Sequence, residues 1–193
     1  MASQLDIPGD KKALRREMIA RRDAMPIAQR ARVAQSLTAR LTALPEYAAA
    51  RTVLATMAIG SEWATAPFIE HARAAGKAIV LPRITPAPRH LEIHVVGDMK
   101  RDLVPGVWGI PQPDPARCRR VDFAEVDFAL VPALAADRAG YRLGYGAGYF
   151  DRLLGNRGAR PFCVTALPGA FVLANVPHDT HDIPVDLVVS DAP

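Results

Sequence analysis

Features that would classify a protein at once are scarce in this sequence of 193 residues. Only two cysteines are present, Cys118 and Cys163, and neither belongs to a Cys-x-x-Cys pair. A disulfide framework is therefore excluded, and a reduced, cytoplasmic setting fits best. No run approaches the roughly 18 uninterrupted apolar residues of a membrane span, and the N-terminus lacks the apolar core of a signal peptide. We expect no membrane partner.

Aromatic residues make up only 6% of the chain, and the net charge is only +4. The basic excess is local, because residues 1–40 hold nine Lys and Arg against four Asp and Glu. Nucleic-acid binders usually spread basic surface more widely or interleave it with aromatic residues. We therefore expect no nucleic-acid partner, and the local charge instead indicates one short segment with a particular anionic ligand.

Common catalytic and nucleotide-binding motifs are also missing. The chain contains no Gly-x-Gly-x-x-Gly, no Gly-x-x-x-x-Gly-Lys-[Ser/Thr] and no Gly-x-Ser-x-Gly, which argues against a Rossmann fingerprint, a Walker loop and a hydrolase elbow. The tract His178-Asp-Thr-His-Asp182 has neither the helical spacing nor the third ligand of a zinc site. We expect neither covalent hydrolase chemistry nor zinc.

Short apolar runs alternate with helical patterns along the chain, and half of the residues are hydrophobic. Strands are predicted at 52–58, 78–81, 90–96, 126–131, 162–166 and 187–189, and helices at 11–25, 27–44, 65–75 and 147–154. Residues 103–117, with four prolines, are predicted to be irregular, and 132–141 to be a loop. This alternation predicts a single-domain, three-layer α/β/α fold with a mostly parallel sheet over residues 11–193, preceded by a disordered segment 1–10.

The predicted helix 11–25 combines an apolar stripe with a row of cations. Lys11, Arg15 and Arg22 fall directly beside the stripe formed by Leu14, Met18 and Met25. One interpretation is that these cations snorkel to solvent from the edge of a buried face. The other is that they point into a cleft.

A glycine-rich segment, Arg142-Leu-Gly-Tyr-Gly-Ala-Gly-Tyr-Phe-Asp-Arg152, opens the short predicted helix 147–154. Its alternate glycines let backbone amides approach an anion, and a helix start adds positive partial charge. Arginine guanidinium groups at both ends suit phosphate or carboxylate. The other interpretation is a flexible turn without a ligand.

Several polar and aromatic side chains have more than one plausible role. Asp151 and Asp186 are candidate ligands of Mg²⁺, although Asp151 is equally placed to pair with Arg152. Glu62 follows a predicted strand and suits either the N–H groups of a heterocycle or the first turn of the next helix. Trp108 suits either stacking on such a ring or packing in the core.

Taken in order, these segments resemble the 5-formyltetrahydrofolate cyclo-ligase family, also called methenyltetrahydrofolate synthetase. The resemblance runs from Lys11 to about Val189 and rests on five segments, namely Lys11-Lys-Ala-Leu-Arg15, Glu62 with Thr65, Trp108-Gly-Ile-Pro-Gln-Pro113, the Arg142–Arg152 loop and His181-Asp-Ile-Pro-Val-Asp186. It implies ATP binding by Lys11, Lys12, Ala13, Leu14, Arg15, Arg142, Leu143, Gly144, Tyr145, Gly146, Ala147, Gly148, Tyr149 and Phe150. It implies folate contacts from Glu62, Trp108, Tyr145, Gly146, Ala147, Gly148 and Tyr149, Mg²⁺ ligands at Asp151 and Asp186, and catalytic roles for Arg142 and Asp151.

The reaction that the resemblance implies is the ATP-dependent cyclisation of 5-formyltetrahydrofolate to 5,10-methenyltetrahydrofolate, with ADP and phosphate released. Such chemistry asks the protein mainly for alignment and charge neutralisation. The family loop usually reads Gly-x-Gly-[Gly/Lys]-Gly-Tyr-Tyr-Asp, whereas this chain has Ala147 and Phe150, so no loop lysine neutralises phosphate here. Two alternatives remain: a nucleotide- or RNA-binding protein without folate activity, and a paralogue that acts on another heterocycle.

Overall fold

The computed structural model describes residues 10–85, 90–155 and 161–192. The segment 1–10, predicted to be disordered, lies outside this range except for its last residue. Asp10 is the N-cap of the first helix, and its carboxylate accepts a hydrogen bond of 2.8 Å from the backbone N of Lys12. The helix cap thus includes a residue that the prediction placed in the disordered segment.

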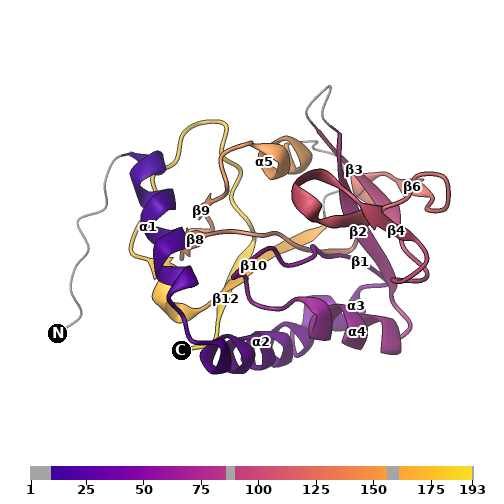
Figure 1. Ribbon diagram of the computed structural model, residues 1–193, viewed down its shortest axis with the longest axis horizontal. Coiled ribbons are helices and arrows are strands. Elements are labelled where there is room, and N and C mark those ends of the chain that lie inside the picture. The colour runs from indigo at the N-terminus through magenta and orange to yellow at the C-terminus, as the bar shows by residue number, and fades with distance from the viewer. Residues whose placement is uncertain (1–9, 86–89, 156–160, 193) are drawn as a thin grey trace.

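Seven strands form the central sheet, in the order β12-β10-β7-β1-β2-β3-β6 (Figure 1). Their bounds are β1 Thr52–Leu54, β2 Ala78–Thr85, β3 His90–Val95, β6 Arg120–Val121, β7 Phe128–Leu130, β10 Phe162–Leu167 and β12 Leu187–Ser190. The five strands from β12 to β2 run parallel, whereas β3 and β6 pair antiparallel at one edge. The predicted mostly parallel sheet is confirmed.

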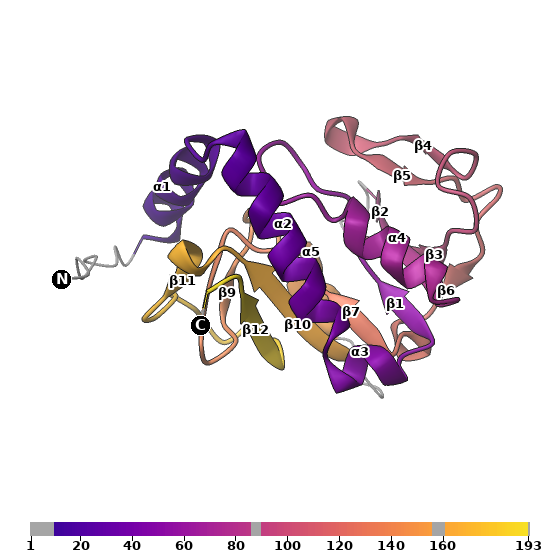
Figure 2. The ribbon, with the colours of Figure 1, turned by 90° about the horizontal axis from the view of Figure 1, so that it is seen from below.

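Helices cover both faces of the sheet, and α2 crosses one face in Figure 2. The helices are α1 Lys11–Asp23, α2 Ile27–Thr42, α3 Pro45–Ala49, α4 Ala66–Ala74 and α5 Tyr149–Leu154. Val53 and Phe128 point into the core beside α2, α3 and α4, whereas their neighbours Leu54 and Ala129 point into the core beside α1 and α5. The central strands are therefore buried on both faces, as parallel strands usually are, and the three-layer prediction is confirmed.

A small sheet with the order β11-β8-β9 lies on the α1 side. It is formed by β8 Ala135–Asp137, β9 Arg142–Leu143 and β11 Val172–Leu173, with short 3₁₀ turns at Phe123–Glu125 and Gly169–Phe171 elsewhere in the chain. The segment 132–141, predicted to be a loop, contains the strand β8, which pairs antiparallel with β9 directly after the segment. No helix in the described part of the chain has both the length and the apolar character that a membrane span requires.

The proline-rich segment is also more regular than predicted. β4 Leu103–Pro105 and β5 Pro111–Pro113 form a two-stranded antiparallel ribbon around the 3₁₀ turn Val107–Gly109. A two-stranded ribbon leaves one side of each strand without a ladder, so prolines are tolerated there. The same reason explains why β2 continues past Pro82: β1 accompanies β2 only as far as Val80.

Two further predictions require correction. The predicted helix 27–44 ends at Thr42, and Pro45 starts the separate short helix α3, because proline is well suited to the first turn of a helix. The alternation of residues 90–96 predicts that His94 lies on the face opposite Leu91, Ile93 and Val95, with Glu92, yet His94 is buried. The segment that leads into β6 covers it, and the Cys118 carbonyl lies 2.9 Å from its Nδ1.

The turn between β8 and β9 is hydrogen-bonded to the C-terminal part of the chain at Val176 and at Val185. Buried Asp137 accepts hydrogen bonds from the backbone N atoms of Ala139, Tyr141 and Val176. Gly140 has a φ of 89°, and its carbonyl accepts a hydrogen bond of 3.0 Å from the N of Val185. A Cβ on Gly140 would lie 2.3 Å from the carbonyl oxygen of Val185, so no larger residue fits without moving the backbone.

We predict that Gly140→Ala lowers the free energy of unfolding by about 3 kcal/mol or more, since it adds a backbone clash to an unfavourable left-handed conformation. Gly76→Ala is the matched control. Gly76 has a φ of 75°, and a Cβ added there would have no heavy atom within 4 Å, so this change should cost only about 1–2 kcal/mol. Urea unfolding of both variants measures the difference, and equal losses would contradict the clash.

Candidate functional site

A cleft of about 1010 Å³ lies at the carboxyl ends of the parallel strands. Thr56 follows β1 and Pro132 follows β7, and both line it together with Leu81 of β2. Open α/β sheets usually bind ligands at this edge. The predicted site residues that line the cleft are Lys11, Arg15, Glu62, Trp108, Arg142, Leu143, Gly144, Tyr145, Gly146, Ala147, Gly148, Tyr149, Phe150 and Asp151.

Four predicted residues do not line the cleft. Lys12 is exposed, Leu14 is buried in the core, and Ala13 lies between them on α1. Asp186 directly precedes β12, and its carboxylate accepts a hydrogen bond of 2.8 Å from the backbone N of Cys163. The cleft lies at the carboxyl ends of the parallel strands, whereas Asp186 lies at the amino ends of β10 and β12. The structure therefore does not bring Asp186 to Asp151.

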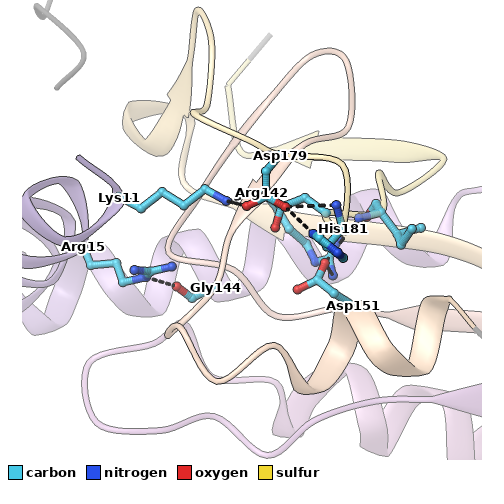
Figure 3. Close-up of polar contacts among 9 residues, drawn as sticks. Lys11, Arg15, Arg142, Gly144, Asp151, Asp179 and His181 are labelled. Atoms are coloured by element: carbon cyan, nitrogen blue, oxygen red, sulfur yellow. Dashed lines mark hydrogen bonds and ion pairs between the residues drawn. The ribbon is translucent and has the colours of Figure 1, made fainter. Parts of the chain in front are cut away.

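The glycine loop, residues Gly144–Gly148, packs against the cationic face of α1. Arg15 donates a hydrogen bond of 2.8 Å from Nε to the carbonyl oxygen of Gly144 (Figure 3). A Cβ on Gly146, which has a φ of 98°, would lie 3.3 Å from the Arg15 Cζ. The absence of a side chain at this position therefore lets the guanidinium lie directly on the loop. Of the two interpretations of the cationic row, the cleft is confirmed for Lys11 and Arg15.

Asp151 pairs with Arg142 rather than with Arg152, which corrects one of the alternatives. Arg142 Nη2 donates to Asp151 Oδ1 at 2.8 Å, and Arg142 Nη1 donates to the carbonyl of Ile183. Burial lowers the pKa of Arg142, while the neighbouring Asp151 carboxylate acts in the opposite direction. Arg152 instead donates to the carbonyl of Ala147 at 2.8 Å. The Arg142–Asp151 pair fixes one wall of the cleft.

Lys11 forms ion pairs with two acids of the loop before β12 (Figure 3). Its Nζ lies 2.9 Å from Asp179 Oδ2 and also contacts Asp182 Oδ2. Partial burial acts to lower the pKa of Lys11, but hydrogen bonds and charges from Asp182 and Asp179 raise it above its usual value. Hydrogen bonds from Lys11 and from the backbone of His181 lower the pKa of Asp179 to about 2.

Sequence reasoning did not assign roles to these two acids. The segment His181–Asp186 was part of the family resemblance, and that signal pointed to the right loop. It did not say which of its carboxylates faces Lys11, because the loop has no helical or strand periodicity from which an orientation follows.

Glu62 also lines the cleft, and both of its carboxylate oxygens accept hydrogen bonds. Oε2 accepts a hydrogen bond of 2.8 Å from the backbone N of Ile59, and Oε1 accepts one from the hydroxyl of Tyr145. Burial, followed by the charge of Glu62, raises the pKa of Tyr145 well above its ordinary value, so the phenol stays protonated. Glu62 therefore closes the turn that follows β1, and it does not cap α4.

Trp108 lies on the rim of the cleft and not in the core. It is 66% exposed, and its φ of 59° is the one positive φ among the described residues other than glycine. Such strained backbone is often held at ligand sites. The same cleft is thus lined by the glycine loop and the cations Lys11 and Arg15 and by a carboxylate and an exposed indole, and such a lining suits an anionic ligand with a flat ring.

Comparison with known proteins agrees with this geometry. A family model described as the 5-formyltetrahydrofolate cyclo-ligase family matches residues 8–191. The 5-formyltetrahydrofolate cyclo-ligase of Mycolicibacterium smegmatis is 30% identical over 185 residues, covering 95% of this chain and 94% of that protein. The protein of the same name from Mus musculus is 26% identical over 192 residues, covering 95% of each chain.

Solved structures give the same result. The NMR structure of 5,10-methenyltetrahydrofolate synthetase from Aquifex aeolicus matches with a TM-score of 0.83 at 30% identity, covering 95% of this chain and 90% of that chain. The 5,10-methenyltetrahydrofolate synthetase of Mycoplasma pneumoniae, at 21% identity and a TM-score of 0.75, shares the fold. From the match over nearly its whole length, the chain belongs to the 5-formyltetrahydrofolate cyclo-ligase family.

Proposed function

We propose that this protein converts 5-formyltetrahydrofolate and ATP into 5,10-methenyltetrahydrofolate, ADP and phosphate. One observation carries the proposal: a single cleft holds a candidate anion-binding side, formed by the glycine loop, Lys11 and Arg15, and a candidate ring-binding side, formed by Glu62 and Trp108, and Tyr145 of the glycine loop contacts Glu62. A reaction between a nucleotide phosphate and a folate needs both ligands side by side in this way. The family membership of the chain supports the same reaction.

In the proposed mechanism, the formyl oxygen attacks the γ-phosphorus and the bond to ADP breaks. The nitrogen at position 10 then attacks the activated formyl carbon. The former formyl oxygen leaves with phosphate as the ring closes, and the N–H proton of the attacking nitrogen is released. The protein aligns the two ligands and stabilises charge through Arg15, Arg142 and the loop amides of Gly144–Gly148. Because Lys11 is already paired with Asp179 and Asp182, phosphate has to exchange with these acids to reach it.

The structure fits a bound Mg²⁺ at one of the two proposed ligands. Asp151 lines the cleft, and among the described residues no hydrogen bond is formed by its second oxygen, Oδ2. One or two carboxylates suffice to hold Mg²⁺ that is also bound to substrate phosphates. When bound, Mg²⁺ would neutralise part of the phosphate charge. We propose Asp151 as its ligand and omit Asp186, which lies outside the cleft.

The cytoplasm is the proposed location. Cys118 and Cys163 are both buried and form no disulfide, and buried cysteines without a disulfide are usual in a reducing compartment.

The direct test of this function follows the absorbance of methenyl-folate with purified protein, Mg²⁺, ATP and 5-formyltetrahydrofolate. We expect product to form only when both substrates are present. Absence of product, together with retention on heparin that falls steeply with salt, would favour the RNA-binding alternative.

For Glu62→Gln, we predict weaker folate binding, by about tenfold or more, with little change in ATP binding, because one acceptor oxygen becomes a donor that faces N–H groups. Calorimetry with each ligand separately measures this. Glu70→Gln on the exposed side of α4 is the control. Equal folate affinity in Glu62→Gln and the wild-type protein would remove Glu62 from the ring-binding side.

Turnover of Asp151→Asn should fall about tenfold or more and recover partly at high Mg²⁺, because the amide keeps an oxygen but loses the charge that Mg²⁺ prefers. Asp151 also pairs with buried Arg142, so a purely structural role predicts lower stability with an unaltered Mg²⁺ requirement. Rates measured against Mg²⁺ concentration separate the two roles. Normalised Mg²⁺ curves that superimpose on those of the wild-type protein would rule out the ligand role.

A further inference from the structure

Arg22, in the last turn of α1, is the third cation of the predicted row, but it does not line the cleft as Lys11 and Arg15 do. Its guanidinium instead contacts residues of two other segments. Nε donates to Ser61 Oγ at 2.9 Å, and Nη1 donates to the hydroxyl of Tyr145 at 2.6 Å. Nη1 also lies 3.6 Å from Glu62 Oε1, and the side chains of Arg22 and Glu62 are each only 12% exposed.

These contacts fix the direction of the hydrogen bond between Tyr145 and Glu62. A phenol has one proton to donate, and a guanidinium can only donate. Because the Tyr145 oxygen accepts from Arg22, its own proton is directed to Glu62 Oε1. The Glu62 carboxylate is thereby held in one orientation, as an acceptor beside a cation.

Arg22 Nε is held in a similar way, by a hydroxyl that accepts from it and donates to a carboxylate. The hydroxyl of Ser61 donates to Asp23 Oδ1, so its oxygen is available to accept from Arg22 Nε. Arg22 and Asp23 are consecutive residues at the end of α1, and together they bind the turn that carries Glu62. The orientation of Glu62 therefore depends on α1, although the cleft is lined by Glu62 and Tyr145 and not by Arg22.

We propose that Arg22 is a positioning residue for the folate side of the site, and that it acts by holding the Tyr145–Glu62 pair in the geometry that accepts the N–H groups of the pterin ring. This inference rests on the proposed function. It differs from a merely structural link between α1 and the turn, because it requires that Arg22 affect folate and not ATP, and that it act through Glu62.

The test compares Arg22→Gln with Arg22→Lys, Glu62→Gln and the double variant Arg22→Gln/Glu62→Gln. The control is Arg21→Gln: Arg21 also joins α1 to another segment, through the carbonyl of Ala170 at 3.1 Å and the ring of Phe171. Melting temperature, calorimetric affinity for 5-formyltetrahydrofolate without ATP, and KM and kcat for each substrate are measured for every variant.

We expect Arg22→Gln to weaken folate binding about tenfold or more, with ATP affinity within about twofold of wild type. Arg22→Lys should recover part of the loss, since it keeps the charge but not the two-pronged geometry. Arg21→Gln should bind folate as the wild-type protein does. In the Glu62→Gln background, Arg22→Gln should add less than about twofold, because residues that act through one contact are not additive.

Additive losses in the double variant, equal losses for ATP and folate, or the same loss in Arg21→Gln would each overturn the inference. If Arg22→Gln does not fold, Arg22→Lys alone and combined with Glu62→Gln makes the same comparison. Unchanged folate affinity in Arg22→Gln, while the wild-type protein forms methenyl-folate, overturns the inference and leaves the proposed function standing. A wild-type protein that binds no 5-formyltetrahydrofolate overturns both.

Discussion

The cleft depends on the docking of one cationic helix face against three separate loops. Leu14 and Met18 anchor α1 in the core, which leaves its cations at the edge of the buried face. From the start of the helix to its end, Lys11 contacts the acidic loop 179–182, Arg15 contacts the glycine loop, and Arg22 contacts the turn that carries Glu62. Without α1, the acidic loop would lose its contact with Lys11, the glycine loop its contact with Arg15, and the turn that carries Glu62 its contact with Arg22.

Among the described residues, some cations of the cleft are paired with carboxylates, whereas Arg15 is not. Lys11 pairs with Asp179 and Asp182, and Arg142 pairs with Asp151, so an anionic ligand must exchange with a carboxylate to reach either of these cations. Arg15 is different. Within the described part of the chain no carboxylate pairs with it, and its one hydrogen bond there goes to the carbonyl of Gly144. Its charge is therefore more directly available to an anionic ligand than the charge of Lys11 or Arg142.

Much of this arrangement could be predicted from the sequence, because it rests on local patterns. The stripe of Leu14 and Met18 indicated the orientation of α1. The glycines of 144–148 predicted that backbone amides approach an anion, whereas the close contact that the structure shows there is made by the guanidinium of Arg15. The partners of the charged groups could not be predicted, because ion pairs such as Lys11–Asp179 join residues 168 positions apart through loops without periodicity. The same limit explains why the sequence grouped Asp186 with Asp151, although Asp186 lies outside the cleft. The proline-rich ribbon was missed because its pairing depends on contacts between strands and not on the intrinsic preferences of its residues.

ATP affinity of Arg15→Ala, measured by calorimetry without folate, tests most directly whether the cationic face of α1 holds the nucleotide. Arg16→Ala is the control, because Arg16 is the next residue of the same helix and is exposed to solvent. We expect Arg15→Ala to bind ATP about tenfold or more weakly at an unchanged melting temperature, with Arg16→Ala close to wild type. Equal ATP affinity in Arg15→Ala and the wild-type protein would contradict the assignment of this helix face to the nucleotide.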